Sequence, residues 1–318
     1  MEKNSPRHYL LILSEDHEVY TQLIGQAHLP DLIIKGTNMP WQVADTAIEY
    51  DLVFGEPALI STVINQLPQV KWVQASWAGV EPLLAKGIRR NYTLTNARNV
   101  YGRLMSEYVF GYLAMIERQI LSYWKAQQEM KWSEDIPGTL RGKNLGLLGV
   151  GSIGSHLALT AHHFAMQVSG YTRQSETCNE VDRYFHGHEW QDFTADLDYL
   201  VCTLPLTNAT RNLVNADFLS SLPTRAWLIN IGRGSTVDEM ALINCLRNGF
   251  LAGAVLDVTT QEPLPSHHPL WNTPNTFLTF HTAARNYPPD IAALFIENYR
   301  RFVDGKLLNF QVNFNLGY

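Results

Sequence analysis

The sequence predicts an α/β protein built from two doubly wound domains, and three observations support this fold class. The chain has 318 residues, and because domains commonly span about 150 residues, two domains are expected. Apolar runs of three to five residues alternate with amphipathic stretches in both halves of the chain, as in parallel strands whose sheet is covered on both faces. A glycine-rich turn follows one such run in the second half, where a strand is expected to pass into a helix.

The first hundred residues predict the first doubly wound unit. One expected helix has Pro57 near its first turn, where the missing N–H of proline would have no partner inside the helix in any case. The expected strands cover residues 9–13, 32–34, 52–54 and 72–74, and the expected helices cover residues 16–27 and 57–66.

The segment 101–132 has a different pattern. It contains no proline and carries apolar residues on more than one face, which predicts one extended helix or two consecutive helices. A helix of this kind must be buried, either in a core or against a second subunit. Residues 134–144 contain Pro137, Gly138 and Gly142 and predict a linker before the α/β pattern restarts.

The second half of the chain repeats the alternation of strands and helices from Asn144 onward. We find no repeat of fixed period and no low-complexity tract. The expected strands cover residues 145–150, 167–171, 200–204, 226–231, 251–258 and 277–280, and helices are expected at 152–164 and 288–304.

The charge and the cysteines exclude several classes of protein. Lys and Arg number 24 against 30 Asp and Glu, a formal net charge of −6, which disfavours nucleic-acid binding because phosphates require a cationic surface. The three cysteines lie far apart without C-x-x-C spacing, so we expect neither a disulfide framework nor a zinc site. No apolar run approaches the ~20 residues that cross a bilayer. We therefore expect a soluble, cytoplasmic protein with no metal and no membrane partner.

The glycine-rich turn predicts a dinucleotide-binding site. Gly149, Gly151 and Gly154 form the pattern G-x-G-x-x-G directly between an expected strand and an expected helix. The first glycine permits a tight turn, the second lets the backbone approach a pyrophosphate, and the third lets helix and strand pack closely. The N-terminus of the helix adds free N–H groups and a partial positive charge. The second half is therefore expected to be a Rossmann-type domain.

The end of the next strand indicates which dinucleotide binds. An Asp or Glu about 20 residues after the glycines would accept a hydrogen bond from a ribose 2′-OH and favour NAD. Arg173 stands at that place, and the nearest acid is Glu176. Because a guanidinium can bind a 2′-phosphate that a carboxylate would repel, we expect NADP(H) to be preferred, with NAD(H) as the alternative.

Beyond the fingerprint, nearly the whole chain resembles the D-isomer-specific 2-hydroxyacid dehydrogenases, most of all their glyoxylate/hydroxypyruvate reductases, which tend to use NADPH. The resemblance implies a flavodoxin-like substrate domain, formed by residues 1–100 and 285–318, into which a dinucleotide-binding domain, residues 101–284, is inserted. It also implies a homodimer formed through the cofactor domains. The segments that carry the resemblance are LPLTNATRNLVN (204–215), LINIGRGSTVDE (228–239), GAVLDVTTQEPLPSHHPLW (253–271) and LTFHTAA (278–284).

The resemblance implies three catalytic residues, and the chemistry of their side chains fits the same roles. Arg233 matches the substrate-anchoring arginine of the family, Glu262 its acid and His281 its proton donor. A guanidinium can bind the carboxylate of a 2-oxo acid and polarise its carbonyl oxygen. An imidazolium can protonate that oxygen as a hydride arrives, and a carboxylate beside the imidazole favours its protonated form. A core role for the histidine is the plain alternative.

Further contacts to substrate and cofactor are expected from the same resemblance. Trp77 is a candidate wall of the substrate pocket, although ordinary core packing is an equal alternative, and the N–H groups of Ala78 and Gly79 are candidate donors to an anion. The expected additional cofactor contacts are Ser152, Ile153, Leu204, Pro205, Thr210, Ile231 and Asp257.

The leading hypothesis is an NADPH-dependent reductase that converts a small 2-oxo acid, such as glyoxylate or hydroxypyruvate, into a D-2-hydroxy acid. Two alternatives stay open. One is an enzyme on the same scaffold that acts on a bulkier or phosphorylated 2-oxo acid. The other is a dinucleotide-sensing binding module, since related corepressor proteins keep the dehydrogenase fold.

Overall fold

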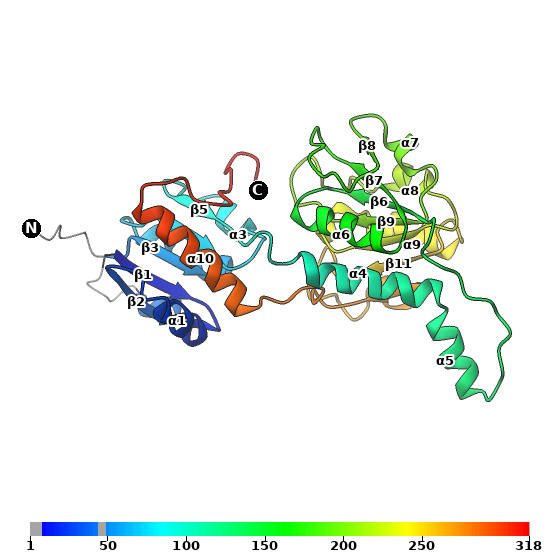
Figure 1. Cartoon of the computed structure of the whole chain (residues 1–318), viewed down its shortest axis with the longest axis horizontal. Coiled ribbons are helices and arrows are strands. Elements are labelled where there is room, and N and C mark those ends of the chain that lie inside the picture. Colours follow the sequence, from blue (N-terminus) through cyan, green and yellow to red (C-terminus); the bar gives the residue numbers. More distant parts are fainter. Residues whose placement is uncertain (1–7, 44–48, 318) are drawn as a thin grey trace, which may run out of the picture. The chain divides into compact units, whose positions relative to one another are not determined.

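The computed structural model describes residues 8–43 and 49–317, which form two compact units (Figure 1). The discontinuous unit contains the residues up to Val100 together with those from Asn286, and the continuous unit is Tyr101–Arg285. The second boundary lies after Arg285. The sequence predicts it one residue earlier, between residues 284 and 285.

The described residues of the discontinuous unit form a parallel sheet of five strands in the order β2-β1-β3-β4-β5, the flavodoxin-like order. The three-residue strand β5 was not expected from the sequence. The strands are β1 (His8–Leu13), β2 (Leu32–Thr37), β3 (Leu52–Gly55), β4 (Trp72–Ala75) and β5 (Thr93–Thr95), and the α-helices are α1 (His17–Gln26), α2 (Pro57–Val63), α3 (Glu81–Leu84) and α10 (Pro288–Val303).

Neighbouring residues of the central strands pack against different helices, as a doubly wound sheet requires. Phe54 of β3 and Trp72 of β4 contact Phe295 of α10, with ring centroids 5.5 and 5.0 Å away. The adjacent residues Val53 and Val73 belong instead to the core that contains α2. Since α10 comes from the C-terminal end of the chain, this packing explains why the C-terminal segment completes the first unit.

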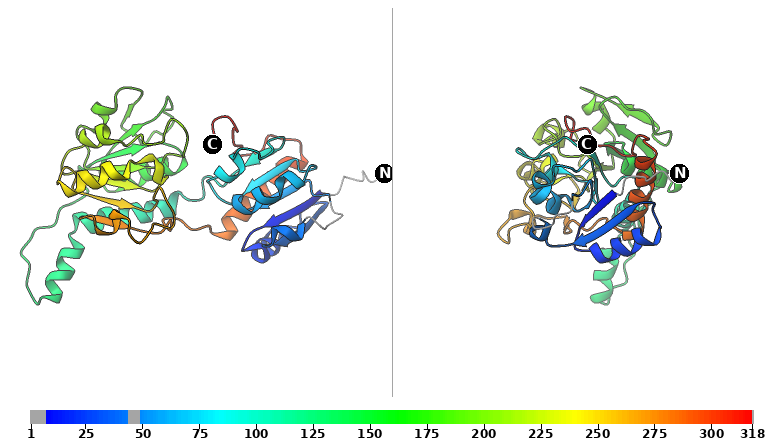
Figure 2. Two further views of the ribbon diagram at one scale, coloured as in Figure 1. Left: turned by 180° about the vertical axis from the view of Figure 1, so that it is seen from behind. Right: turned by 90° about the vertical axis from the view of Figure 1, so that its left-hand side faces the viewer.

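The described residues of the continuous unit form a parallel sheet of seven strands in the order β12-β11-β10-β9-β6-β7-β8. Figure 2 shows the same unit from two further directions. This Rossmann-type order confirms the expected fold class. The short strand β8 was not expected. The strands are β6 (Asn144–Leu148), β7 (Gln167–Tyr171), β8 (Arg183–Phe185), β9 (Tyr199–Cys202), β10 (Trp227–Asn230), β11 (Gly253–Leu256) and β12 (Thr276–Leu278).

Helices cover both faces of this sheet because alternate residues of its strands enter two separate cores. Leu200 of β9 packs in the core with α8 and α9, whereas Val201 packs in the core with α4 and α6. The α-helices of this unit are α4 (Gly102–Glu117), α5 (Ile120–Gln128), α6 (Ser152–His163), α7 (Trp190–Thr194), α8 (Ala216–Ser220) and α9 (Glu239–Arg247).

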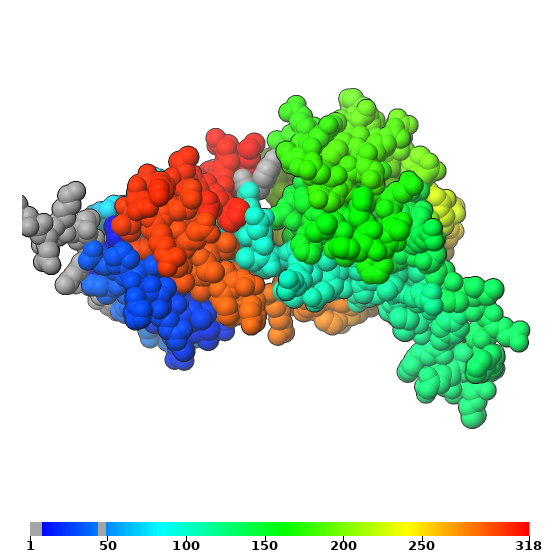
Figure 3. Space-filling view, in the orientation of Figure 1, coloured from blue at the N-terminus to red at the C-terminus, as the bar shows by residue number. Residues whose placement is uncertain are grey.

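The segment 101–132 forms two helices rather than one, and they differ in burial. Gln119 between them has a φ of 52°, in the left-handed region, which ends α4 and turns the chain into α5. Helix α4 buries Val109 and Leu113, as expected. No residue of α5, all of which the structure describes, is buried in this chain, and the segment stands out from its own unit (Figure 3). The expectation of burial therefore holds within the chain for α4 and not for α5.

Within the described residues, no helix is both long and apolar enough to cross a membrane.

Candidate active site

Most of the candidate residues come after the carboxyl ends of parallel strands in the continuous unit, and therefore lie along one edge of its sheet. In open α/β sheets this edge binds ligands where the strand order reverses, which here is between β6 and β9. Across the sheet, the sequence places His281 after β12, Asp257 and Glu262 after β11, Arg233 after β10, Leu204 after β9, Gly149 after β6 and Arg173 after β7.

The turn between β6 and α6 has the geometry of a phosphate cradle. Gly149 has a φ of +102°, and a Cβ at Gly154 would lie 2.4 Å from the carbonyl oxygen of Gly149, so both positions require glycine. A Cβ at Gly151 would meet no atom of the described chain within 4 Å, which leaves room for a ligand against the backbone. Helix α6 begins at Ser152 without a side-chain cap. The N–H groups of its first turn, including Ile153, therefore fit the pyrophosphate of a dinucleotide.

Arg173 lies in the exposed turn after β7, two residues beyond the strand. The nearest acid, Glu176, accepts a hydrogen bond over 2.8 Å from Nε2 of His186, whose pKa is raised chiefly by this contact. Arg173 thus occupies the position where an Asp or Glu that binds the ribose 2′-OH would be expected.

The loop after β9 is shaped by Thr210. Its hydroxyl donates to the carbonyl oxygen of Pro205 over 2.6 Å and accepts from the N–H of Thr207 over 2.8 Å. The side chain of Thr210 thus closes the loop that begins at Leu204. Ile231, at the end of β10, is buried and donates its N–H to Cys202 of β9 over 3.1 Å. Thr210 and Ile231 thus fix the course of the backbone after β9 and β10.

Asn230, which no sequence pattern had indicated, sets the turn that carries Arg233. Its buried amide donates to the carbonyl oxygen of Arg233 over 3.0 Å and accepts from the N–H of Gly232 over 3.1 Å. A Cβ at Gly234 would lie 2.0 Å from the carbonyl carbon of Thr259, so the turn packs directly against the loop after β11. The signal that could have identified Asn230 is a polar residue directly after the apolar residues Leu228 and Ile229.

His281 and Glu262 form a hydrogen-bonded pair. Nδ1 of His281 lies 2.7 Å from Oε2 of Glu262, and Oε1 of the same carboxylate accepts from the N–H of Thr259 over 3.0 Å. A carboxylate only accepts, so Nδ1 carries the hydrogen and Nε2 is the nitrogen that can exchange a proton with a ligand. The imidazole is 52% exposed, which excludes the alternative of a core histidine.

Asp257 has its carboxylate buried against the loop that carries His281. Its carboxylate, in a residue only 2% exposed, accepts from the hydroxyl of Thr279 over 2.5 Å and from the N–H groups of Thr282 and Ala283 over 2.8 and 3.1 Å. Its backbone carbonyl accepts from the N–H of His281 over 2.8 Å. Asp257 therefore holds the loop that carries His281. No sequence pattern had indicated Thr279 either. The available signal was a threonine two residues before the candidate histidine.

Trp77, Ala78 and Gly79 come after β4 in the discontinuous unit. Trp77 is 48% exposed, which excludes plain core packing in this chain. The carbonyl oxygen of Ala78 accepts from the buried amide of Asn96 over 2.7 Å, which anchors the loop. No hydrogen bond joins the N–H groups of Ala78 or Gly79 to another residue in the described ranges. Both N–H groups are thus available to an anion.

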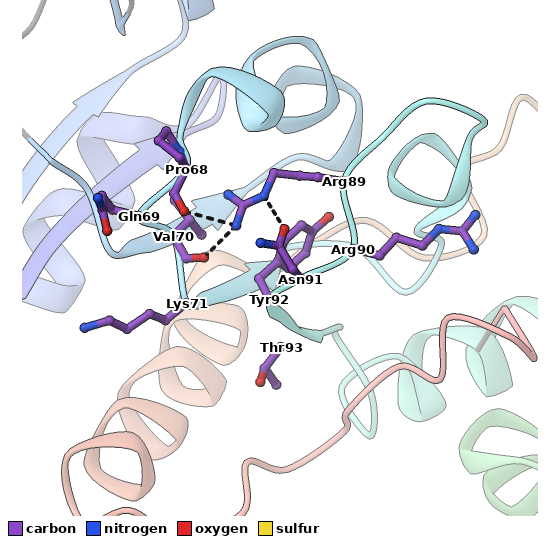
Figure 4. A pocket seen from close by; sticks show the side chains of 9 residues that line it. All are labelled: Pro68, Gln69, Val70, Lys71, Arg89, Arg90, Asn91, Tyr92 and Thr93. Atoms are coloured by element: carbon purple, nitrogen blue, oxygen red, sulfur yellow. Dashed lines mark hydrogen bonds between the residues drawn. The ribbon is translucent and has the colours of Figure 1, made fainter.

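The same unit has a cavity of about 590 Å³ at the amino ends of β4 and β5, the edge opposite Trp77 (Figure 4). Its most prominent group, the guanidinium of Arg89, donates to Asn91 and to the carbonyl oxygens of Leu67, Pro68 and Val70. Arg89 thus ties two loops together, and we assign it a structural role. In residues 8–43 and 49–317, no group of three His, Cys, Asp or Glu side chains is arranged to hold a metal ion.

Comparisons with known proteins identify the family. Residues 110–283 match the family described as D-isomer specific 2-hydroxyacid dehydrogenase, NAD binding domain. The chain is 31% identical over 217 residues to a glyoxylate/hydroxypyruvate reductase A of Photorhabdus laumondii, covering 68% of this chain and 69% of that protein.

Two solved structures extend the similarity to both units. A D-isomer specific 2-hydroxyacid dehydrogenase family protein of Aeromonas salmonicida is 38% identical, with a TM-score of 0.91 over 97% of this chain and 99% of the other. A D-isomer specific 2-hydroxyacid dehydrogenase of Xanthobacter autotrophicus, solved with NADPH and MES, is 29% identical, with a TM-score of 0.85 over 98% of this chain and 100% of the other. The chain therefore belongs to the D-isomer specific 2-hydroxyacid dehydrogenases, a family of NAD(P)-dependent enzymes.

Proposed function

We propose that this enzyme is an NADPH-dependent reductase of small 2-oxo acids, with glyoxylate and hydroxypyruvate as its substrates and D-2-hydroxy acids as its products. The observation that carries the proposal is the pair of His281 and Glu262, joined over 2.7 Å at the sheet edge that also bears Arg233 and the glycine fingerprint. The name of the Photorhabdus relative supports this choice of substrates.

Arg233 is the residue proposed to bind the substrate. Its guanidinium binds the carboxylate of the 2-oxo acid and polarises the carbonyl oxygen. The N–H groups of Ala78 and Gly79 are proposed as further donors to the carboxylate, and the exposed ring of Trp77 is proposed to limit the size of the substrate.

His281 is proposed to deliver the proton. Because Nδ1 is held by Glu262, the proton passes from Nε2 to the carbonyl oxygen while hydride reaches the carbonyl carbon, and the product is a neutral hydroxyl. Glu262 stabilises the positive charge that the imidazolium carries before transfer. In the oxidative direction the neutral imidazole takes the proton back.

The continuous unit is proposed to bind NADP(H). When bound, the reduced nicotinamide supplies the hydride. The turn Gly149–Gly154 receives the pyrophosphate, and the guanidinium of Arg173 binds the 2′-phosphate. Ile231, Asp257 and the loop that begins at Leu204 are proposed to line the nicotinamide half of the site.

A homodimer is proposed to cover α5. Its aromatic and aliphatic side chains Ile120, Leu121 and Trp124 are 51, 46 and 61% exposed, and Trp132 beyond the helix is 93% exposed, which is unusual for a single chain in water. Sedimentation of the Trp124→Glu variant tests this assembly. A shift from dimer to monomer supports it, and an unchanged dimer removes α5 from the interface.

The cytoplasm is the proposed compartment. The cysteines Cys178, Cys202 and Cys245 are all unpaired, which suits a reducing environment.

The experiment that tests the function is a steady-state screen of 2-oxo acids of increasing size against NADPH and NADH. We expect the highest kcat/KM for glyoxylate or hydroxypyruvate with NADPH. A clear preference for a bulkier or phosphorylated 2-oxo acid would contradict the substrate assignment, and a preference for NADH would contradict the cofactor assignment.

A further inference from the structure

The loop that carries His281 is held in a strained conformation. His281 has a φ of 57°, in the left-handed region that non-glycine residues rarely adopt. A strained backbone of this kind persists only where the surrounding contacts fix it. The position of the catalytic imidazole therefore depends on the contacts that hold residues 279–283.

The first of these contacts come from the end of β11. The N–H of Thr279 donates to Leu256 over 3.0 Å, and the N–H of His281 donates to Asp257 over 2.8 Å. The carboxylate of Asp257 accepts the N–H groups of Thr282 and Ala283 from the far side of the histidine. Asp257 thus clamps the loop at two places, through its backbone carbonyl at His281 and through its carboxylate at Thr282 and Ala283.

The clamp continues into helix α4. The hydroxyl of Thr279 lies 2.5 Å from Oδ1 of Asp257 and 2.8 Å from the hydroxyl of Tyr108. Thr279 has one hydroxyl hydrogen, and the carboxylate only accepts, so that hydrogen goes to Asp257. Tyr108 must then donate to Thr279. Burial raises the pKa of Tyr108, which keeps its phenol protonated and able to donate.

Helix α4 is itself fixed to the helix of the glycine fingerprint. Ser106 lies 2.8 Å from Nδ1 of His156 of α6 and accepts from Thr160 of the same helix over 3.2 Å. A Cβ at Gly102 would meet the ring of His156 at 2.8 Å, so the two helices are in close contact. One helix thus contacts the helix of the phosphate cradle through Ser106 and the histidine loop through Tyr108.

We infer that Tyr108 is a positioning residue, which orients the catalytic imidazole of His281 through the directed hydrogen-bond chain from Tyr108 to Thr279 to Asp257. The inference rests on the proposed role of His281 as proton donor. Tyr108 acts through the loop and does not touch the reacting atoms. Loss of its hydroxyl leaves Thr279 with an unfilled acceptor and loosens the clamp on residues 281–283.

The kinetic test compares Tyr108→Phe with Tyr184→Phe. The hydroxyl of Tyr184 in β8 donates to the carbonyl oxygen of Cys178 over 3.1 Å, at the opposite edge of the sheet from β12, so this control keeps the chain to Thr279 intact. We expect Tyr108→Phe to lower kcat about 3- to 10-fold, the range that one hydrogen bond can account for, with KM for NADPH unchanged. Tyr184→Phe keeps the native kcat. A native kcat in Tyr108→Phe would overturn the inference.

Variants of Thr279 test whether the residues form one chain. Thr279→Val removes the middle hydroxyl and should lower kcat to a similar extent, whereas Thr279→Ser restores it. The double variant Tyr108→Phe with Thr279→Val should be no slower than Thr279→Val alone, because both changes break the same chain. Losses that multiply would show two independent effects and would refute the chain.

Hydrogen exchange separates this inference from the proposed function. In Tyr108→Phe the amides of Thr282 and Ala283 should exchange faster, and those of α6 should exchange as in the native enzyme. If the native enzyme reduces no 2-oxo acid but this local acceleration occurs, the proposed function is wrong and the clamp is supported. Unchanged exchange at both amides contradicts the clamp whatever the enzyme turns over.

Discussion

The two parallel sheets of this chain share one architecture and differ in the loops at the carboxyl ends of their strands. In the continuous unit, the loops after β10, β11 and β12 carry Arg233, Glu262 and His281. In the discontinuous unit, the loop after β4 offers two backbone N–H groups and the ring of Trp77. We propose that the carboxyl edge of the sheet binds a ligand in each unit and that the loop residues decide its chemistry. We therefore expect substitutions of Arg233, Glu262 or His281 to affect the rate. A substitution of Trp77 should affect substrate choice.

The largest effect is expected from His281→Ala, which removes the proposed proton donor. We expect kcat for reduction to fall about 10²- to 10⁴-fold, while NADPH binding, followed by fluorescence titration, stays near the native value. His267→Ala is the matched control, because His267 is an exposed loop histidine outside the site. Turnover that survives in His281→Ala would place the proton donor elsewhere.

A smaller loss is expected from Glu262→Gln. Glutamine keeps the size of the side chain but not the charge that stabilises the imidazolium, so kcat/KM for reduction should fall about 10- to 100-fold, the range of one charged hydrogen bond. Glu262→Asp, which keeps the negative charge, should retain more of the rate than Glu262→Gln. An equal loss in the two variants would indicate that Glu262 acts only as a structural contact.

Cofactor choice is expected to change in Arg173→Asp. The new carboxylate repels a 2′-phosphate and can accept from a ribose hydroxyl, so the ratio of kcat/KM for NADPH over NADH should fall about 10- to 100-fold. Arg141→Asp, in an exposed loop before β6, controls for the added negative charge. An unchanged ratio would remove Arg173 from the specificity argument.

The smallest effect is expected in the discontinuous unit, from Trp77→Ala. Removal of the ring should raise kcat/KM for a bulkier 2-oxo acid relative to glyoxylate by about 10-fold, the lower end of the effect of one methylene group in a pocket. Rates measured with a series of 2-oxo acids of increasing length test this. Uniform loss across the series would show that Trp77 binds all substrates equally and sets no size limit.

Much of the fold could be predicted from the sequence because buried parallel strands are continuous apolar runs. The exceptions are informative. Strands β5 and β8 have the sequences TLT and RYF, neither of which contains a run of three apolar residues, and each forms by pairing with a longer neighbour. The break between α4 and α5 depends on the left-handed conformation of Gln119, which its residue type does not signal.

The site could be predicted only in part, for a similar reason. The glycine fingerprint is local, and its spacing alone predicts its geometry. Arg233, Glu262 and His281 were recognised through a family resemblance rather than through any local pattern. The contacts that hold them are not local: Thr279 contacts Tyr108 from 171 positions away, and the carboxylate of Asp257 accepts from the N–H groups of Thr282 and Ala283, 25 and 26 positions away. Such partners depend on tertiary packing.

The most direct test of the central claim is a crystal structure of the enzyme with NADP and oxamate, an unreactive analogue of a 2-oxo acid. We predict that the carboxylate of oxamate lies against the guanidinium of Arg233 and that Nε2 of His281 lies within hydrogen-bond distance of its carbonyl oxygen. Oxamate bound away from Arg233, or His281 separated from Glu262 in that complex, would contradict this claim.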